Sequence, residues 1–340
     1  MARRALSRAS LAVVQAVTPV LSDRPTRIGV SGGADSMALA AAVARVAAAR
    51  PVEALVVDHG LWQGSGEHSR RVAAQVEGLG LPVGIARVEV DARDGGIESA
   101  ARTARHHALW LTPATRGRAI EEVWLAHSLD DQAESVLLGL ARGSGTRSLA
   151  GMASRRRERM PGVPADAEVV RPLLGLRRSV LREACADWGI RVWDDPANAD
   201  PRFLRSAVRA DAIPALVGVF GDAVIEALAR TADLARADAD ALDTLAGVAA
   251  AAALEGDRLR VEAIDGLPEA LRSRVVRGWL DAAGCPEVHR RHVAAVLELV
   301  DDWHGQGPLH LPGGVRVERS GGLLVASGPA RGLAALGPLG

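Results

Sequence analysis

The chain has 340 residues, enough for two or three domains of roughly 100–200 residues each. Hydrophobic residues make up 48% and charged residues 24%, close to ordinary globular values, which excludes a wholly disordered chain. No run approaches the roughly 20 apolar residues of a membrane span, and the two cysteines indicate neither a disulfide framework nor a CxxC metal site. We therefore expect a cytoplasmic protein with no membrane partner.

The formal net charge of zero hides an uneven distribution. All 41 basic residues are arginine, because the sequence contains no lysine, and a high-GC genome is the simplest reason. Residues 142–209 carry 14 arginines against 8 acids, a net of +6, whereas residues 222–302 carry 9 against 16, a net of −7. A basic middle can direct an anionic partner to one face, although a solvated loop with compensating charges elsewhere explains the same pattern.

In the first half of the chain, apolar runs alternate with helical patterns. After a short helix within residues 1–24, strands are predicted at 27–30, 52–58, 83–90 and 123–127. Helices are predicted between and after them, at 36–49, 66–79, 97–111 and 130–141. This alternation predicts a parallel α/β sheet with right-handed crossovers, a doubly wound Rossmann-like domain.

The second half departs from this alternation. Segment 142–166 contains GSG, two prolines and a cluster of four arginines at 155–157 and 159, and we predict a mobile basic loop there. Beyond a helix at 179–188 and a turn-rich segment at 194–201, helices are predicted at 223–254, broken near Gly247, and at 268–283 and 290–303. Alternation in 307–327 predicts a small terminal β-hairpin. The expected organisation is an N-terminal helix (1–24), an α/β domain (25–215) and a mainly helical C-terminal domain (216–340) that ends in the hairpin.

The strongest local pattern is IGVSGGADS at residues 28–36, where a short apolar strand runs into two glycines and then a helix. Glycines let the backbone approach a phosphate closely, and the N–H groups at a helix N-terminus supply positive potential. The segment has neither the GK[ST] of a lysine-bearing P-loop nor GxGxxG. It resembles the PP-loop of the ATP pyrophosphatases, which cut ATP to AMP and pyrophosphate. A purely structural Gly-Gly turn is the alternative.

Polar residues follow two further predicted strands. His59 follows the second strand and His127 ends the fourth, and ligands bind outside the carboxyl ends of parallel strands. His59 as a capping residue of its turn is an equal alternative. Asp131 and Glu134 are three residues apart and share one helical face. Two carboxylates there can hold Mg²⁺ or an ammonium group, whereas an N-cap with a capping-box acid would explain Asp130.

A series of motifs runs through residues 25–220 in a fixed order. The motifs are SGGADS, VDHGL, GIESAARTARHHAL, AHSLDDQAESVLLGLARGSG, LAGM, RPLLGLRRSVLREACADWGI, DDPANAD and FLRSAVR. SGGxDS alone indicates only the PP-loop superfamily. The DDQAE–RGSG block, followed by RPLL and the DPxN segment, is more specific, and with it the chain resembles the tRNA(Ile)-lysidine synthase family.

The resemblance implies an ATP-dependent ligase that modifies the wobble cytidine of the isoleucine tRNA whose anticodon is CAU. ATP would adenylate the oxygen on carbon 2 of the base, and the amine of free L-lysine would then displace AMP. The implied partners are this tRNA, free lysine and ATP with Mg²⁺, and a homodimer is left open. The C-terminal domain is implied to help dock tRNA.

Site residues follow from the same resemblance. Asp35 would sit by the ATP phosphates through Mg²⁺, and with Asp131 and Glu134 it completes the implied catalytic set. Asp131 and Glu134 are implied to bind the ammonium groups of lysine, with Asp130 as a third candidate. The implied nucleotide site comprises Ser31, Gly32, Gly33, Ala34, Asp35, Ser36, His59 and His127. Further implied contacts to nucleotide, cytidine or tRNA are Glu98, Arg102, Arg105, Arg142, Arg205 and Arg209.

The arginines of this set have plainer explanations as well. Glu98 and Arg102 could form an i,i+4 surface pair. The resemblance also implies a basic surface for the tRNA backbone, made by residues 155–159 together with Arg171, Arg177, Arg178, Arg205 and Arg209. For any one of these arginines, a solvated surface residue is the plainer alternative.

Four residues, Trp62, His106, Ser128 and Ser206, depart from the family pattern, which leaves the packing of the base open. A tRNA thiolase of the same superfamily is one alternative function, but it would need a cysteine relay or an iron–sulfur cluster, and this chain has two isolated cysteines. A nucleotide-binding tRNA adaptor without catalysis is the other. It would not need both SGGADS and DDQAE.

Overall fold

The computed structural model describes residues 6–90, 96–115, 117–143, 145–194 and 204–328. The chain divides into two compact units. The first comprises residues 1–143 and 148–232, and the second comprises residues 144–147 and 233–340. The domain boundary predicted at residue 216 lies within the first unit.

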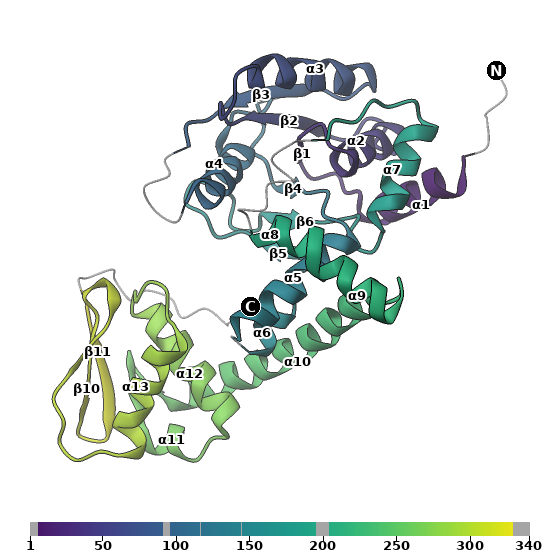
Figure 1. Ribbon diagram of the computed structural model, residues 1–340. Helices are drawn as coiled ribbons and strands as arrows, with labels where there is room; N and C mark the ends of the chain where they lie inside the picture. The colour runs from purple at the N-terminus through teal and green to yellow at the C-terminus, as the bar shows by residue number, and fades with distance from the viewer. Residues whose placement is uncertain (1–5, 91–95, 116, 144, 195–203, 329–340) are drawn as a thin grey trace. The chain divides into compact units, whose positions relative to one another are not determined.

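The first unit is built on a six-stranded sheet with the strand order β3-β2-β1-β4-β6-β5 (Figure 1). Five strands are parallel, and the edge strand β5 pairs antiparallel with β6. Their bounds are β1 Thr26–Val30, β2 Val52–Asp58, β3 Val83–Arg87, β4 Glu122–Trp124, β5 Arg155–Arg157 and β6 Glu168–Val170. The chain moves outward from β1 to β3 and then returns to β4 on the other side of β1. The predicted doubly wound α/β sheet is therefore confirmed, with a switch point between β1 and β4 where ligands bind in such folds.

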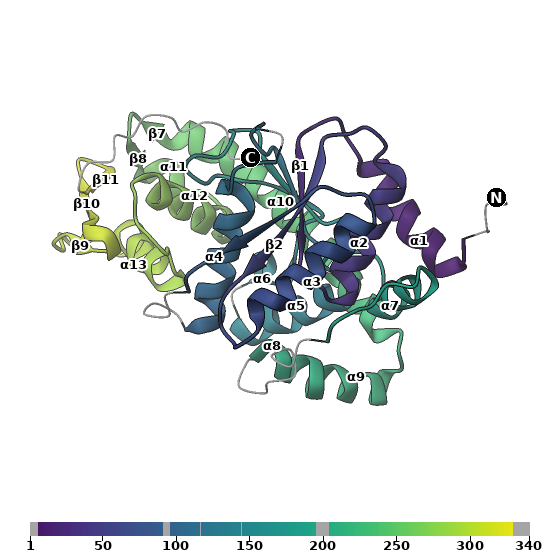
Figure 2. The same cartoon turned by 90° about the horizontal axis from the view of Figure 1, so that it is seen from above.

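Helices cover both faces of this sheet. On one face, α1 (Arg8–Val17), α2 (Ala34–Val46) and α7 (Arg178–Asp187) lie against one another (Figure 1 and Figure 2) and share a core with β1 and β2. Helix α3 (Ser65–Gly78) adds Val72 and Val76 to that core. A second core places Leu109 and Trp110 of α4 (Ile97–Leu111) with Leu55, Val123 and Val169. Helix α5 (Leu129–Arg142) follows β4.

A buried ion pair lies inside the sheet, where the sequence pattern predicted only an apolar strand. Arg27 of β1 is 0% exposed, and its Nε lies 2.9 Å from Oε1 of Glu53 on β2. Its Nη1 donates to the carbonyls of Leu109 and Thr112 at 2.9 and 2.8 Å. The guanidinium is satisfied, which is the condition under which a charge can be buried without a large penalty.

The prediction of a mobile basic loop over 142–166 is wrong in part. The segment contains helix α6 (Thr146–Leu149) and strand β5, whose three residues are all arginines. β5 pairs with β6 from Arg155↔Val170 to Arg157↔Glu168, and Arg155 Nη1 lies 2.6 Å from Glu168 Oε2. Pairing with a neighbouring strand orders a run that has no apolar alternation of its own.

The end of the first unit is helical, with α8 (Leu204–Ala207), the π-helical turn η3 (Val208–Ala212) and α9 (Ile213–Phe220). Helix α10 (Val224–Ala253) then continues into the second unit, without the break predicted near Gly247. Within the described ranges no single helix is long and apolar enough to cross a membrane. One pair of consecutive helical segments has the length and composition of a membrane span only when the two are taken together. They are Leu204–Phe220 and Val224–Ala253, and their axes are bent by 104° relative to one another.

The second unit joins helices α11 (Val261–Asp265), α12 (Glu269–Ala282) and α13 (Arg290–Asp301) to an antiparallel sheet of order β7-β8-β11-β10-β9. The strands are β7 Leu254–Glu255, β8 Arg258–Arg260, β9 Leu309–His310, β10 Arg316–Ser320 and β11 Leu323–Ser327. The core includes Leu259, Trp279, Leu280, Val296 and Leu324. The predicted terminal hairpin is β10–β11, while the β7–β8 pair was missed because each strand is only two or three residues long.

Candidate active site

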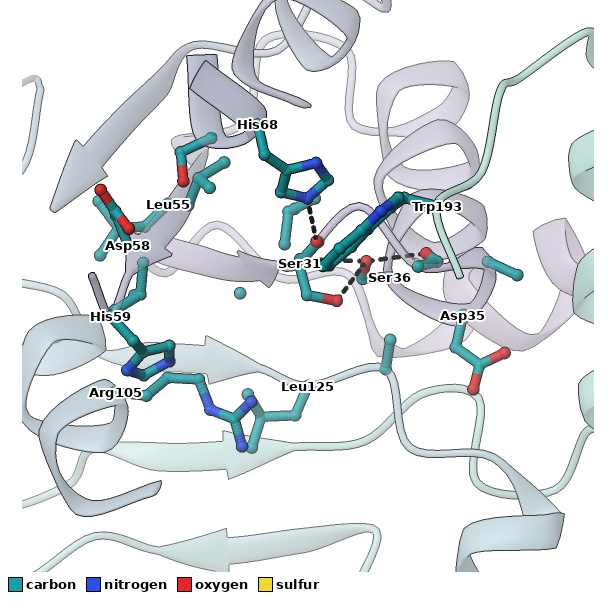
Figure 3. Close-up of a pocket in the computed structure, with 18 of the residues that line it drawn as sticks. Ser31, Asp35, Ser36, Leu55, Asp58, His59, His68, Arg105, Leu125 and Trp193 are labelled. Atoms are coloured by element: carbon teal, nitrogen blue, oxygen red, sulfur yellow. Dashed lines mark hydrogen bonds between the residues drawn. The ribbon is translucent and has the colours of Figure 1, made fainter. Parts of the chain in front are cut away.

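A cavity of about 700 Å³ lies in the first unit, at the carboxyl ends of β1, β2 and β4 (Figure 3). Its walls include the PP-loop after β1, His59 after β2 and His127 after β4. Arg178 of α7 lines it from a later part of the chain. The strand order thus brings together the motifs that the sequence separates by about a hundred residues.

The PP-loop has a conformation that requires its first glycine. Gly32 has φ +89°, and a Cβ there would lie 2.6 Å from Val72 Cγ2. Ser36 Oγ accepts a hydrogen bond from the Ser31 N–H at 3.2 Å and donates to the Gly33 carbonyl at 3.0 Å. The first helical hydrogen bond of α2 runs from the Met37 N–H to the Gly33 carbonyl at 3.0 Å. The three preceding N–H groups of α2 therefore have no acceptor within the helix and can bind an anion.

An aromatic cluster that sequence reasoning missed lies against this loop. The rings of Trp62 and Trp193 stack with centroids 5.8 Å apart, and the His68 ring lies 3.9 Å from that of Trp193. The backbone N–H of Trp193 donates to the Gly32 carbonyl at 3.0 Å, and His68 Nε2 lies 3.4 Å from the Ser31 carbonyl (Figure 3). Because N–H and C=O point in opposite directions across a planar peptide, these contacts aim the loop amides away from the cluster. The sequence offered only the aromatic character of these residues, which does not show that they lie together.

Asp35 stands at the first turn of α2 beside the loop. Its Oδ2 lies 3.4 Å from Arg178 Nε, while its Oδ1 is buried and has no hydrogen-bond partner among the described residues. Burial raises the pKa of Asp35 to about 6, an effect that Arg178 opposes and the negative charge of Asp131 increases. One carboxylate oxygen of Asp35 is therefore available to a ligand.

The start of α5 is fixed by a capping box, but with a different acid from the one predicted. Ser128 is the N-cap, and Asp131 Oδ2 accepts from both its N–H and its hydroxyl at 2.9 Å. The capping-box acid is thus Asp131, whereas Asp130 accepts a 2.7 Å hydrogen bond from the backbone N–H of Arg178. Ser128, one of the departures from the family pattern, therefore holds Asp131 in place.

Asp131 and Glu134 point into a cluster of three arginine side chains. Arg178 Nη2 lies 2.7 Å from Asp131 Oδ1, and Glu134 receives Arg205 Nε at 2.9 Å and Arg209 Nε at 2.7 Å. Both acids are buried, Glu134 to 1% exposure. Although burial opposes ionisation, the charge of Arg178 and the hydrogen bond from the Ser128 backbone N–H hold the pKa of Asp131 below its usual value. Asp131 is therefore ionised, and both acids face guanidinium groups.

The two histidines of the predicted site are both in the cavity wall. His127 Nδ1 accepts a hydrogen bond from Arg171 Nε at 3.2 Å. Burial, the largest influence, lowers the pKa of His127 to about 3, with Asp131 opposing it. The pKa of His59 is likewise lowered by burial and by Arg105, which lies beside it (Figure 3).

The other predicted site residues divide between the cavity and its surroundings. Arg105 and Arg209 line the cavity, whereas Arg205 is not among its described lining residues and pairs with Glu134 at 2.9 Å. Among the described lining residues, Arg102 and Arg142 do not occur, and both are exposed. The side chain of Glu98 lies outside what the structure describes, as do residues 195–203 of the turn-rich segment. Arg178, predicted only for a basic surface, was missed as a site residue because RPLLGLRRS gives no sign that it turns inward.

Comparison with known proteins places these features in a family. Residues 7–216 match a family described as a PP-loop domain, and residues 259–324 match one described as a TilS substrate binding domain. A tRNA(Ile)-lysidine synthase of Leifsonia xyli is 49% identical over 312 residues, covering 87% of this chain and 88% of its own. Those of Salinispora tropica and Mycobacterium tuberculosis are each 44% identical, covering 90% and 86% of this chain and 91% and 86% of theirs.

The chain belongs to the tRNA(Ile)-lysidine synthase family. Both the sequence resemblance and the predicted PP-loop are confirmed. The SGGADS motif forms the PP-loop and the first turn of α2, and the DDQAE motif supplies the buried acids Asp131 and Glu134 of α5.

A solved structure outside the family has a related fold. It is the U34-tRNA thiolase NcsA of Methanococcus maripaludis with its [4Fe-4S] cluster, 16% identical with a TM-score of 0.53, covering 67% of this chain and 80% of its own. The likeness concerns the fold alone. This lysidine synthase family member has only Cys185 and Cys285, both buried. Burial raises the pKa of Cys185 to about 12, which keeps it a thiol at neutral pH.

Proposed function

We propose that this chain ligates free lysine to carbon 2 of the wobble cytidine of the CAU-anticodon isoleucine tRNA. The observation that carries the proposal is one cavity lined by the PP-loop and by the buried acid Asp131, with buried Glu134 three residues further along α5, in a chain 43–49% identical to tRNA(Ile)-lysidine synthases. A PP-loop supplies ATP chemistry, and a pair of carboxylates supplies recognition of an amine. The combination fits a reaction that consumes both ATP and an amine.

The PP-loop would bind the phosphates of ATP. The N–H groups at the start of α2 are directed by the loop, and the helix N-terminus adds a partial positive charge. Arg178 and Arg209 line the same cavity and add full charges. The base of ATP has apolar surface available at Leu55, Leu109 and Leu125. Phosphate recognition thus falls on backbone and arginine, which suits a chain without lysine.

Asp35 fits the Mg²⁺ that such chemistry requires. Its buried Oδ1 has no hydrogen-bond partner among the described residues, and a hard oxygen donor is what Mg²⁺ prefers. Mg²⁺ is commonly held by one or two carboxylates together with the phosphates of the substrate. When bound, the ion would neutralise charge as pyrophosphate leaves.

The reaction proceeds in two displacements. The oxygen on carbon 2 of cytidine bonds to the α-phosphorus of ATP as the bond to the β-phosphate oxygen breaks, which releases pyrophosphate. The amine of lysine then bonds to carbon 2 as the carbon–oxygen bond breaks, which releases AMP, and the nitrogen loses a proton. The chain contributes positioning and charge: guanidinium groups at the phosphates and carboxylates at the amine.

Lysine recognition rests on Asp131 and Glu134. Both acids contact guanidinium groups, which are cationic donors like the ammonium groups of free lysine. We infer that lysine joins or replaces Arg205 and Arg209 there, because these two approach Glu134 from outside α5, on α8 and η3. The released guanidinium groups would then be free for phosphates of nucleotide or tRNA.

The second unit would dock tRNA by shape rather than by a broad phosphate-binding face. Residues 233–340, which make up most of that unit, carry 15 acids against 11 arginines, a net charge of −4 that does not favour a polyanion. A chain that ends before residue 222 should therefore bind tRNA more weakly and with less selectivity. Unchanged affinity and selectivity would show that the unit has another role.

The test of the whole proposal is incorporation of labelled lysine into a CAU-anticodon isoleucine tRNA transcript with ATP and Mg²⁺. A transcript with uridine at the wobble position is the matched control. Label in the first transcript alone supports the proposal. No label in either, from a preparation that binds ATP, would overturn it in favour of a thiolase or an adaptor.

A further inference from the structure

We propose that His127 works as a neutral hydrogen-bond donor through its Nε2–H, that Arg171 holds it in this tautomer, and that it is not the base that deprotonates lysine. The proposal rests on the proposed function for its substrate. Its structural part, the tautomer of His127, can be tested without measuring any activity. It assigns Arg171, until now counted with a basic surface, as a positioning residue.

Two adjacent strands bring these side chains together. β4 and β6 are parallel neighbours, paired from Glu122↔Glu168 to Trp124↔Val170. His127 follows β4 and Arg171 follows β6, so both emerge at the carboxyl edge where the cavity lies. The Arg171 backbone N–H is fixed on the Ser154 carbonyl at 2.8 Å, and its Nη1 donates to the Ala153 carbonyl at 2.7 Å. The guanidinium therefore approaches His127 from a fixed direction.

The contact decides the tautomer of the imidazole. Arg171 Nε lies 3.2 Å from His127 Nδ1. A guanidinium remains protonated in proteins and offers donors only. Nδ1 must then be the acceptor and carry the lone pair, and in a neutral ring the proton is on Nε2. A histidine held in this way has no free lone pair with which to accept a proton from a substrate.

The charges around His127 keep it neutral. Arg171, Arg205 and Arg105 face it with positive charge, while Asp131 is the acid that faces it. Burial and these cations disfavour the imidazolium form, and Asp131 opposes them. The same reasoning leaves Nε2–H as the donor that this residue presents to the cavity it lines.

The acceptor chemistry follows from the position. His127 shares the cavity wall with the PP-loop, on the neighbouring strand. We assign its partner as an oxygen on the phosphorus of the adenylate group, where negative charge develops in both displacements. His127 keeps its proton throughout, and no bond to it forms or breaks.

The tautomer can be read directly from the full-length chain labelled with ¹⁵N in its histidine rings. Long-range proton–nitrogen spectra distinguish the two ring nitrogens, and the His127→Gln variant assigns the signal by its loss. We expect the Nε2–H pattern, unchanged between pH 5 and 9. A protonated Nδ1 or a titration within that range would overturn the proposal, whatever the activity. In Arg171→Met we expect a mixture of tautomers or a titration, and Arg171→Lys should restore part of the wild-type pattern.

Activity tests the role of the donor with two isosteres. The amide nitrogen of glutamine can take the place of Nε2, whereas that of asparagine can take only the place of Nδ1. We expect His127→Asn to lower the rate of lysine transfer by about 100- to 1,000-fold, as removal of one preorganised donor does, and His127→Gln to lose far less. Both variants should keep the wild-type melting temperature within a few degrees. Equal losses, or a larger loss for glutamine, would refute the donor role. If the wild-type chain transfers no lysine, the proposed function fails while the tautomer remains measurable.

Discussion

Replacing Asp131 with asparagine separates lysine recognition from nucleotide binding. The carboxylate uses Oδ2 for the N–H and hydroxyl of Ser128 and Oδ1 for Arg178 Nη2 at 2.7 Å. If the amide oxygen of asparagine keeps the Ser128 contacts, its NH₂ group faces a guanidinium that offers only donors. The charge-assisted bond at Oδ1 is then lost, both to Arg178 and to the ammonium group of a lysine that would bind there.

The size of the effect follows from the Arg178 bond, because it is the shorter of two at Oδ1, with Arg209 Nη2 at 3.3 Å. A hydrogen bond to a charged group is worth about 1.5–3 kcal/mol, which corresponds to a rise of about 10- to 150-fold in the KM for lysine. Arg178 keeps Asp35 at 3.4 Å and Glu134 at 3.5 Å. The free energy of unfolding should therefore fall by about 1–2 kcal/mol and not by the 3–5 or so of an orphaned buried charge.

The assay measures the KM for labelled lysine with the tRNA transcript and, separately, the Kd for ATP. We expect the Kd for ATP to change by less than about threefold, because the PP-loop does not depend on the lost bond. Asp222→Asn is the matched control: its carboxylate pairs with Arg177 but is 75% exposed, so a change within about twofold is expected. Equal losses in ATP binding and lysine use would contradict the reasoning and place Asp131 with the metal.

Three further predictions follow from the packing of the first unit. Gly32→Ala, at φ +89° with its Cβ 2.6 Å from Val72, should weaken ATP binding at least tenfold and cost about 1–3 kcal/mol of stability, measurable by titration and thermal melting. Cys185, whose pKa burial raises to about 12, should resist alkylation by iodoacetamide at pH 8 until the chain is unfolded, as mass spectrometry would show; rapid native labelling would contradict its burial. Arg27→Met leaves Glu53 buried without its charge partner and should lower the free energy of unfolding by about 3–5 kcal/mol in denaturant titration; an unchanged midpoint would refute the importance of the pair.

The parts of the fold that depend on local pattern were predictable from the sequence. The strand 52–58 is a continuous apolar run, and β2 spans those residues. Helix 97–111 is amphipathic and α4 has the same bounds. β5 was missed because RRR has neither apolar residues nor alternation, and it becomes a strand only through pairing with β6.

The candidate site shows the same division between local and long-range information. Short motifs predicted the local parts of the site: the glycines of SGGADS predicted the PP-loop, and DDQAE predicted the acids of α5. The partners of those acids come from 44 to 78 residues further along the chain, at Arg178, Arg205 and Arg209. An arginine that turns inward to a carboxylate and one that faces solvent look identical in sequence. Trp193 is likewise recognised as a support of the PP-loop only in the structure, where its backbone N–H donates to the Gly32 carbonyl.

The position of β5 at the margin of the sheet has a consequence for how copies of this chain meet. A strand at a sheet margin offers unpaired N–H and C=O groups on which a strand from another molecule can form. Here the three outermost residues, Arg155–Arg157, are all exposed arginines. A second copy that approached strand to strand would set guanidinium groups against guanidinium groups and would have to strip them of water. The arginine run therefore opposes strand-to-strand association at this edge, and replacing it with valines should increase aggregation.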